Sequence, residues 1–182
     1  MPPVDALVAA WLEPWRHYHG VSHLKALLRG IDGLDLPPED RALLELAAWF
    51  HDAVLIPLRN DNEERSAVWA RDALGAAGRP DAGERLYALI AATRHHQADG
   101  DALCAVFLDL DLGVLGASPA AYAAYVDGVR REFARLPARS WRQGRRRVLE
   151  HLLAGGIYQT PRFQAEREEA ARRNLAAELA TL

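Results

Sequence analysis

Histidine side chains are concentrated in the N-terminal part of this 182-residue chain. Six of the seven histidines lie within the first 96 residues. Imidazole titrates near neutral pH and is a common metal ligand. The sequence therefore predicts acid–base or metal chemistry around His17, His19, His23, His51, His95 and His96.

Arg16, His19 and His23 follow one another at spacings of three and four residues. An unbroken helix over residues 15–30 would place all three on one face. The alternative is a solvated arginine beside packed histidines.

His51 and Asp52 are adjacent at the end of a strongly apolar segment that includes Trp49 and Phe50. Burying a carboxylate there costs several kcal/mol unless it is paired or bound to a metal. A surface His–Asp pair is the alternative.

Two further carboxylates, Asp109 and Asp111, interrupt the apolar run from Phe107 to Leu112. Two residues apart on a helix, they point to nearly opposite sides. One can face an internal site while the other caps a helix or faces solvent. The alternative is a partly exposed helix end that tolerates both acids.

The order of these residues resembles the H…HD…D signature of the HD superfamily of metal-dependent phosphohydrolases. The chain looks closest to a small bacterial family of predicted hydrolases within it. The resemblance covers nearly the whole chain and rests on Arg16-His17-Tyr18-His19 with His23, Phe50-His51-Asp52, Asp61-Asn62-Glu63 with Ser66-Ala67, Thr93 with His96, Asp111-Leu112 with Leu115-Gly116, Gly144-Arg145, Ile157-Tyr158, and Ala171 to Leu175.

The resemblance implies an all-α HD fold and one divalent metal ion held by His23, His51, Asp52 and Asp111. Asp109 stays open as the alternative to Asp111, because the superfamily's last aspartate is not usually followed directly by leucine. Two imidazoles and two carboxylates suit Mn²⁺, Fe²⁺, Co²⁺, Ni²⁺ or Zn²⁺ better than Mg²⁺.

Hydrolysis of a phosphate ester or phosphoanhydride by metal-activated water follows from this set. Arg16 and His19 are predicted to be catalytic and to bind the phosphoryl group, whose charge needs positive partners. Glu63 is predicted to orient water or act as general base. Its alternative role is a first-turn acid that stabilises a helix dipole.

Thr93 and His96 share a helix face at a spacing of three and are predicted to contact substrate. His95 and His96 also leave open a second metal, which with iron would mean a di-iron oxygenase. Arg145 belongs to a cluster with Arg139, Arg142, Arg146 and Arg147. We expect that cluster to be mainly a solvated helix face, from which Arg145 reaches toward phosphate.

Composition predicts the elements that position these residues. The chain holds 34 Ala and 27 Leu against 4 Ile and 10 Val, a balance that favours helices over strands. We expect a single all-α domain over residues 1–182, a bundle of about eight helices. The predicted segments are 5–12, 15–30, 38–52, 61 onward, 81–96, 101–113, 118–136, 140–155 and 160–182.

Charge and composition exclude several classes of protein. A net charge of −3 and a pI near 6.2 argue against nucleic-acid binding. Cys104 is the only cysteine, so an intramolecular disulfide is excluded. The sequence shows neither a secretory signal nor a long apolar run.

We expect a cytoplasmic protein with a small phosphorylated substrate, such as a nucleotide, and no membrane partner; a homodimer is left open. The competing function is a non-catalytic nucleotide- or polyanion-binding module.

Overall fold

The computed structural model describes residues 4–182, in which helices are joined by loops and no strand occurs, and this confirms the all-α prediction. A short 3-10 segment, η1, joins two of the α-helices. The elements are α1 (Val4–Trp11), α2 (Val21–Asp32), α3 (Pro38–Phe50), α4 (Asn62–Ala76), α5 (Pro80–Ala92), α6 (Ala102–Asp111), η1 (Leu112–Gly116), α7 (Pro119–Glu132), α8 (Ala138–Ala154) and α9 (Pro161–Leu179).

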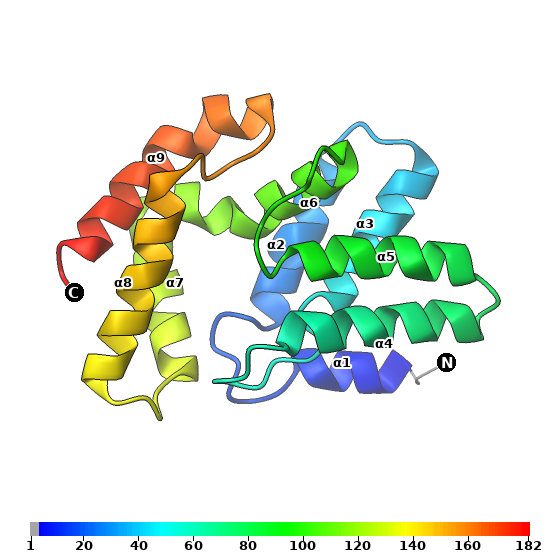
Figure 1. The fold of residues 1–182 in the computed structure, drawn as a ribbon, viewed down its shortest axis with the longest axis horizontal. Helices are drawn as coiled ribbons and strands as arrows, with labels where there is room; N and C mark the ends of the chain where they lie inside the picture. The colour runs from blue at the N-terminus through cyan, green and yellow to red at the C-terminus, as the bar shows by residue number, and fades with distance from the viewer. Residues whose placement is uncertain (1–3) are drawn as a thin grey trace.

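The larger hydrophobic core lies among α2 to α6. α4 and α5 run side by side, and α3 and α6 pack against α5 (Figure 1). Leu27, Leu44, Leu89 and Phe107 from four of these helices are almost wholly buried in it. This core holds the end of α3 and the start of α2, which carry the predicted metal ligands.

A second, smaller core lies among η1 and the last three helices, which form the left-hand side of Figure 1. Leu149, Ala171 and Leu175 are fully buried in it, and Tyr158 and Leu115 almost fully. Leu110 packs against both cores. The two cores therefore meet along the α6–η1 segment, immediately beside Asp111.

Helix boundaries follow the sequence where a side chain caps the helix. The Ser118 side chain accepts from the Ala121 N–H at the start of α7, and Thr160 accepts from the Phe163 N–H at the start of α9. Pro38 occupies the first turn of α3, as predicted.

Several predicted helix boundaries are wrong. α5 ends at Ala92, four residues before the predicted end, so Thr93 and His96 share no helix face. Residues 15–20 form a loop, so Arg16 and His19 share no helix face with His23. Gly20 precedes α2, which begins only at Val21. Asp61 and Asp81, where two of the predicted segments begin, do not cap a helix with their side chains: Asp61 pairs with Arg59, and Asp81 lies inside α5.

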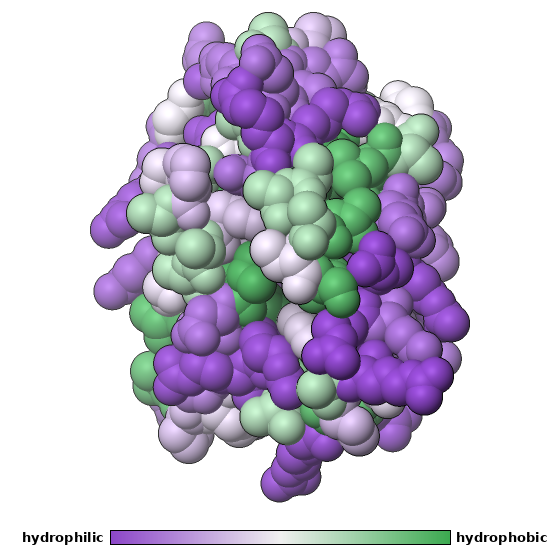
Figure 2. All heavy atoms as spheres, turned by 90° about the vertical axis from the view of Figure 1, so that its left-hand side faces the viewer, coloured by the Kyte–Doolittle hydropathy of each residue, from purple (hydrophilic) through white to green (hydrophobic). Residues whose placement is uncertain are grey.

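The outer face of the last three helices carries mostly hydrophilic side chains, with apolar ones gathered between them (Figure 2). Among residues 4–182 no single helix has the length and apolar character to cross a membrane. The bent pair Ala102–Gly116 and Pro119–Glu132 meets that test by length and composition alone.

Candidate metal centre and its cleft

Four side chains predicted as metal ligands converge where the two cores meet. His23 comes from the first turn of α2, His51 and Asp52 follow the end of α3, and Asp111 ends α6. His23 Nε2 lies 3.1 Å from His51 Nε2 and 3.1 Å from Asp111 Oδ1. His51 Nε2 lies 3.0 Å from Asp52 Oδ2 and 3.5 Å from Asp111 Oδ1. The fold thus brings together residues separated by up to 88 positions.

The donor set and its spacing fit a divalent cation. Donor atoms of His23, His51 and Asp52 lie within 4.8 Å of one another, and this group could hold a metal ion. Metal–ligand bonds of about 2.0–2.2 Å place neighbouring ligand atoms about 3 Å apart, close to the distances above. Two imidazoles and two carboxylates are also the mixed nitrogen–oxygen set that transition metals prefer.

The His51 ring is oriented by its other nitrogen. Nδ1 lies 3.0 Å from the Ala48 carbonyl oxygen, which can only accept, so this contact requires the proton on Nδ1. The neutral ring then carries its lone pair on Nε2, toward the cluster. Trp11 and Phe107 rings flank His51, at centroid distances of 5.7 and 5.8 Å, and keep the imidazole 2% exposed.

Electrostatics couple the imidazoles to the carboxylates. Burial alone would lower the pKa of His51, but the charges of Asp52 and Asp111 raise it well above its usual value. Burial would raise the pKa of Asp111, but hydrogen bonds with His23 and His51 hold it well below the usual carboxyl range. The pKa of Asp52 is lowered in the same way by His51. Both carboxylates are therefore ionised and available as ligands.

The structure separates the roles of Asp109 and Asp111. Asp109 is fully buried and points away from the histidines. Its oxygens accept from the Gln159 N–H (2.7 Å), the Thr160 N–H (2.8 Å) and the Thr160 hydroxyl (2.6 Å). It therefore anchors the start of α9 to α6. Only Asp111 faces the cluster, and the expectation of opposite directions for the two acids is confirmed.

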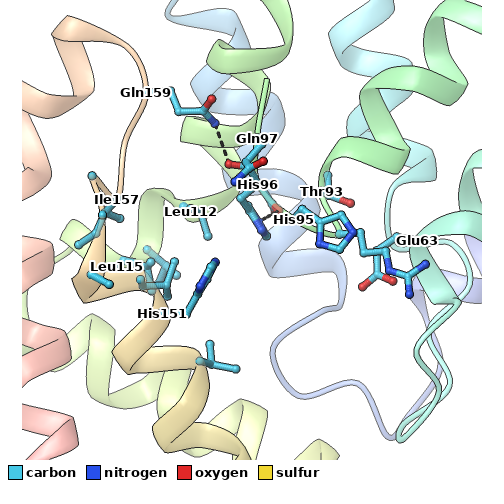
Figure 3. Close-up of a pocket in the computed structure, with 18 of the residues that line it drawn as sticks. Glu63, Thr93, His95, His96, Gln97, Leu112, Leu115, His151, Ile157 and Gln159 are labelled. Atoms are coloured by element: carbon cyan, nitrogen blue, oxygen red, sulfur yellow. Dashed lines mark hydrogen bonds and ion pairs between the residues drawn. The ribbon is translucent and has the colours of Figure 1, made fainter. Parts of the chain in front are cut away.

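A cleft of about 930 Å³ opens on the cluster. Figure 3 shows Glu63, Thr93 and His95 on one side and Leu115, His151 and Ile157 on the other, with His96 and Leu112 between them. Tyr18, His19 and Asp111 also line it. A smaller hollow of about 500 Å³ reaches His23 and Asp111 between α2 and α9.

His96 is the most unusual residue of the cleft. Its backbone is left-handed (φ 51°), a conformation that few residues other than glycine adopt. Its Nε2 lies 3.4 Å from Asp111 Oδ2. Within residues 4–182, it is the one buried side-chain polar atom that lacks a hydrogen-bond partner. An imidazole nitrogen that makes no hydrogen bond and lies 3.4 Å from a carboxylate oxygen is a candidate position for a ligand or a second metal.

Arg16 lies beneath the cluster and does not line the cleft. Its buried guanidinium donates to the carbonyl oxygens of His19 (3.1 Å), Asp52 (2.6 Å) and Ala53 (3.2 Å). A helix end leaves carbonyl groups without partners, and Arg16 supplies donors just beyond the end of α3. Here it holds the Asp52–Ala53 backbone.

His19 lines the cleft and is held by Glu132, a residue that sequence reasoning missed. Glu132 Oε1 accepts from the backbone N–H groups of His17, Tyr18 and His19 at 2.8–2.9 Å. Oε2 lies 2.7 Å from His19 Nδ1. Burial would lower the pKa of His19, but this hydrogen bond raises it. A lone glutamate at the end of an amphipathic helix carries no sequence signal for this role.

The remaining predicted residues divide between cleft and core. Glu63, in the first turn of α4, and Thr93, whose hydroxyl donates to the Ile90 carbonyl at 2.7 Å, both line the cleft. Arg145 is buried in the second core, with its guanidinium bonded to Glu178 and Tyr125. The structure does not bring Arg145 into the cleft. Sequence reasoning also missed Tyr18 and His151, which do line it.

Comparisons with protein-family models, with curated proteins and with solved structures find no match to this chain.

Proposed function

We propose that this chain is a metal-dependent phosphohydrolase of the HD type, which cleaves a phosphate ester or phosphoanhydride of a small metabolite or nucleotide. The observation that carries the proposal is the convergence of His23, His51, Asp52 and Asp111 beside a cleft that Asp111 lines. A purely structural polar cluster would have no need of a cleft opening on it.

Four residues would hold the cation, which when bound supplies Lewis-acid polarisation of a phosphoryl oxygen and acidifies water. The other side chains act around it. Glu63 lies at the rim, where its carboxylate can accept a proton from the attacking water. His19, with Nδ1 held by Glu132, offers Nε2 to a phosphoryl oxygen, and the Thr93 backbone and side chain form part of the wall. Arg16 keeps the ligand-bearing backbone in place.

Elemental analysis of protein purified without chelator tests the proposal. We expect about one transition metal per chain, lost in Asp52→Ala, and hydrolysis of phosphate esters by the metal-loaded protein. Absence of bound metal even after dialysis against Mn²⁺ or Co²⁺ would contradict the proposal. Bound metal without hydrolysis of any phosphate ester or anhydride would favour the non-catalytic binding module.

His96 favours a second candidate, a two-metal form of the same centre. Its unpartnered Nε2 beside Asp111 Oδ2 is the supporting observation. This form predicts two metals per chain, reduced to one in His96→Ala. If the protein binds two iron ions per chain and is coloured, the function is that of a di-iron oxygenase and not of a phosphohydrolase.

A further inference from the structure

The cleft has two chemically different ends. Its reactive end is lined by His19, His96 and Asp111. The opposite wall, from η1, α8 and the segment after it, carries the apolar side chains Leu115, Val148, Leu152 and Ile157. His151 and Leu115 lie on this side in Figure 3, across from Thr93 and His95.

The apolar wall is not closed by packing. Val148 is 48% exposed although it is a large hydrophobic residue, and Leu152 beside it, one turn further along α8, is half-buried. Other members of this helix, such as Leu149, are fully buried in the second core. Val148 and Leu152 therefore extend the second core into the cleft as a surface that a ligand can cover.

Positive charge accompanies this wall. Arg147 precedes Val148 and also lines the cleft, as does Arg94 on the other side. Among residues 4–182 neither arginine forms an ion pair with a carboxylate. An occupant that suits both features is an anion with an apolar body, whereas a sugar phosphate would set hydroxyl groups against the apolar wall.

We infer that the substrate is a phosphate monoester whose leaving group has an apolar or aromatic body, which packs on Val148 and Leu152. This inference rests on the proposed function, because it assigns the phosphoryl group to the metal end. The volume of the cleft, about 930 Å³, exceeds what a phosphate group alone requires and falls within the range of sites for medium-sized organic ligands.

Two alkyl phosphates with similar leaving groups test it: 2-phenylethyl phosphate and 2-hydroxyethyl phosphate. We expect kcat/KM to be about 10- to 100-fold higher for the phenylethyl ester, the range that a few apolar groups provide in a hydrophobic pocket. Val148→Asn should reduce this preference several-fold. Val8→Asn, at an exposed valine of α1 outside the cleft, is the matched control and should leave the preference unchanged.

Binding of two non-hydrolysable analogues, 3-phenylpropylphosphonate and methylphosphonate, gives a readout that needs no catalysis. Equal rates on the two esters, or equal affinities for the two phosphonates, would overturn the inference and leave the proposed function standing. Failure to hydrolyse either ester with any divalent metal would count against the proposed function. In that case a clear preference for the phenyl phosphonate, lost in Val148→Asn, would still support the apolar subsite.

Discussion

At the scale of single residues, the molecule places chemically similar side chains in opposite roles. Asp109 and Asp111 are two positions apart in one helix, yet one is a fully satisfied hydrogen-bond acceptor and the other faces two imidazoles. The two arginines expected near phosphate, Arg16 and Arg145, are both buried against protein acceptors. The type of a residue therefore indicates its role only when the groups that it contacts are known.

The two aspartates form a matched pair of variants. Asp109→Asn places an amide where three donors point, and we expect the free energy of unfolding to fall by about 1–3 kcal/mol with bound metal retained. Asp111→Asn should remove the metal and lower stability less. Urea unfolding and elemental analysis of both variants check this. If Asp109→Asn loses the metal while Asp111→Asn keeps it, Asp109 is the ligand and our assignment is wrong.

At the scale of elements, loops and helix ends are held by single charged side chains. Arg16 satisfies carbonyl groups beyond α3, and Glu132 at the end of α7 binds three consecutive N–H groups of the loop before α2. Gly128 allows this approach, because a Cβ there would lie 3.1 Å from the Cβ of Tyr18. The loop that carries His19 is therefore positioned by α7 and not by α2.

Glu132→Gln tests that contact. One amide oxygen can still accept the backbone N–H groups, but the amide N–H₂ opposes the protonated Nδ1 of His19. We expect a loss of about 1–2 kcal/mol in stability and a lower kcat with unchanged metal content. A hydrogen-exchange measurement should show faster exchange at residues 17–19. Unchanged exchange and activity would contradict the positioning role.

The start of α6 depends on Asp101. Its side chain accepts from the Leu103 and Cys104 N–H groups and pairs with Arg85. The Arg85 hydrogen bond lowers the pKa of Asp101 to about 2, below the unfolded value of about 3.9. The charged form thus stabilises the fold above pH 4, and this contribution disappears as the pH falls from about 4 to 2.

Asp101→Asn keeps a capping side chain and removes the charge. At pH 7 we expect the variant to be about 0.5–1 kcal/mol less stable, with the difference vanishing toward pH 2. Denaturant unfolding of both proteins across that pH range measures the difference in the free energy of unfolding. The titration of the other carboxyl groups is common to both proteins and cancels in this difference. A difference independent of pH would show that the Arg85 pair contributes nothing.

At the scale of the whole molecule, a buried ion pair joins the last three helices beside the cleft. Arg145 on α8 donates to both carboxylate oxygens of Glu178 on α9, at 2.7 and 2.9 Å, and to the Tyr125 hydroxyl on α7 at 2.9 Å. The Tyr125 ring in turn contacts Tyr18, 4.6 Å between centroids, and Tyr18 stacks beside His23. The second core is thereby connected to the candidate metal centre.

Arg145→Met would leave Glu178 buried without its cation, and we expect a loss of about 3–5 kcal/mol in stability. The double variant Arg145→Met/Glu178→Leu should recover much of that loss, because no charge is then left unpaired. Thermal unfolding of the three proteins checks this. A single variant that keeps its stability but loses affinity for phosphate would instead support the substrate-binding role predicted from the sequence.

Sequence by itself determined the helical class and which polar residues need partners. Alanine and leucine dominate the composition. A histidine or carboxylate in an apolar segment must find a partner, which indicated His51, Asp52 and one of the two acids Asp109 and Asp111 without deciding between them. Local capping chemistry also placed the starts of α7 and α9.

Tertiary structure decided everything that depends on long-range contacts. Whether Asp109 or Asp111 faces the histidines depends on where Thr160 lies, 51 residues later. Whether Arg16 binds phosphate or carbonyl groups depends on the end of α3, 36 residues away. Glu132 and the cleft wall on α8 became visible only because the two cores meet beside Asp111. Side-chain direction relative to distant elements is set by packing of the whole chain, and local residue patterns do not contain it.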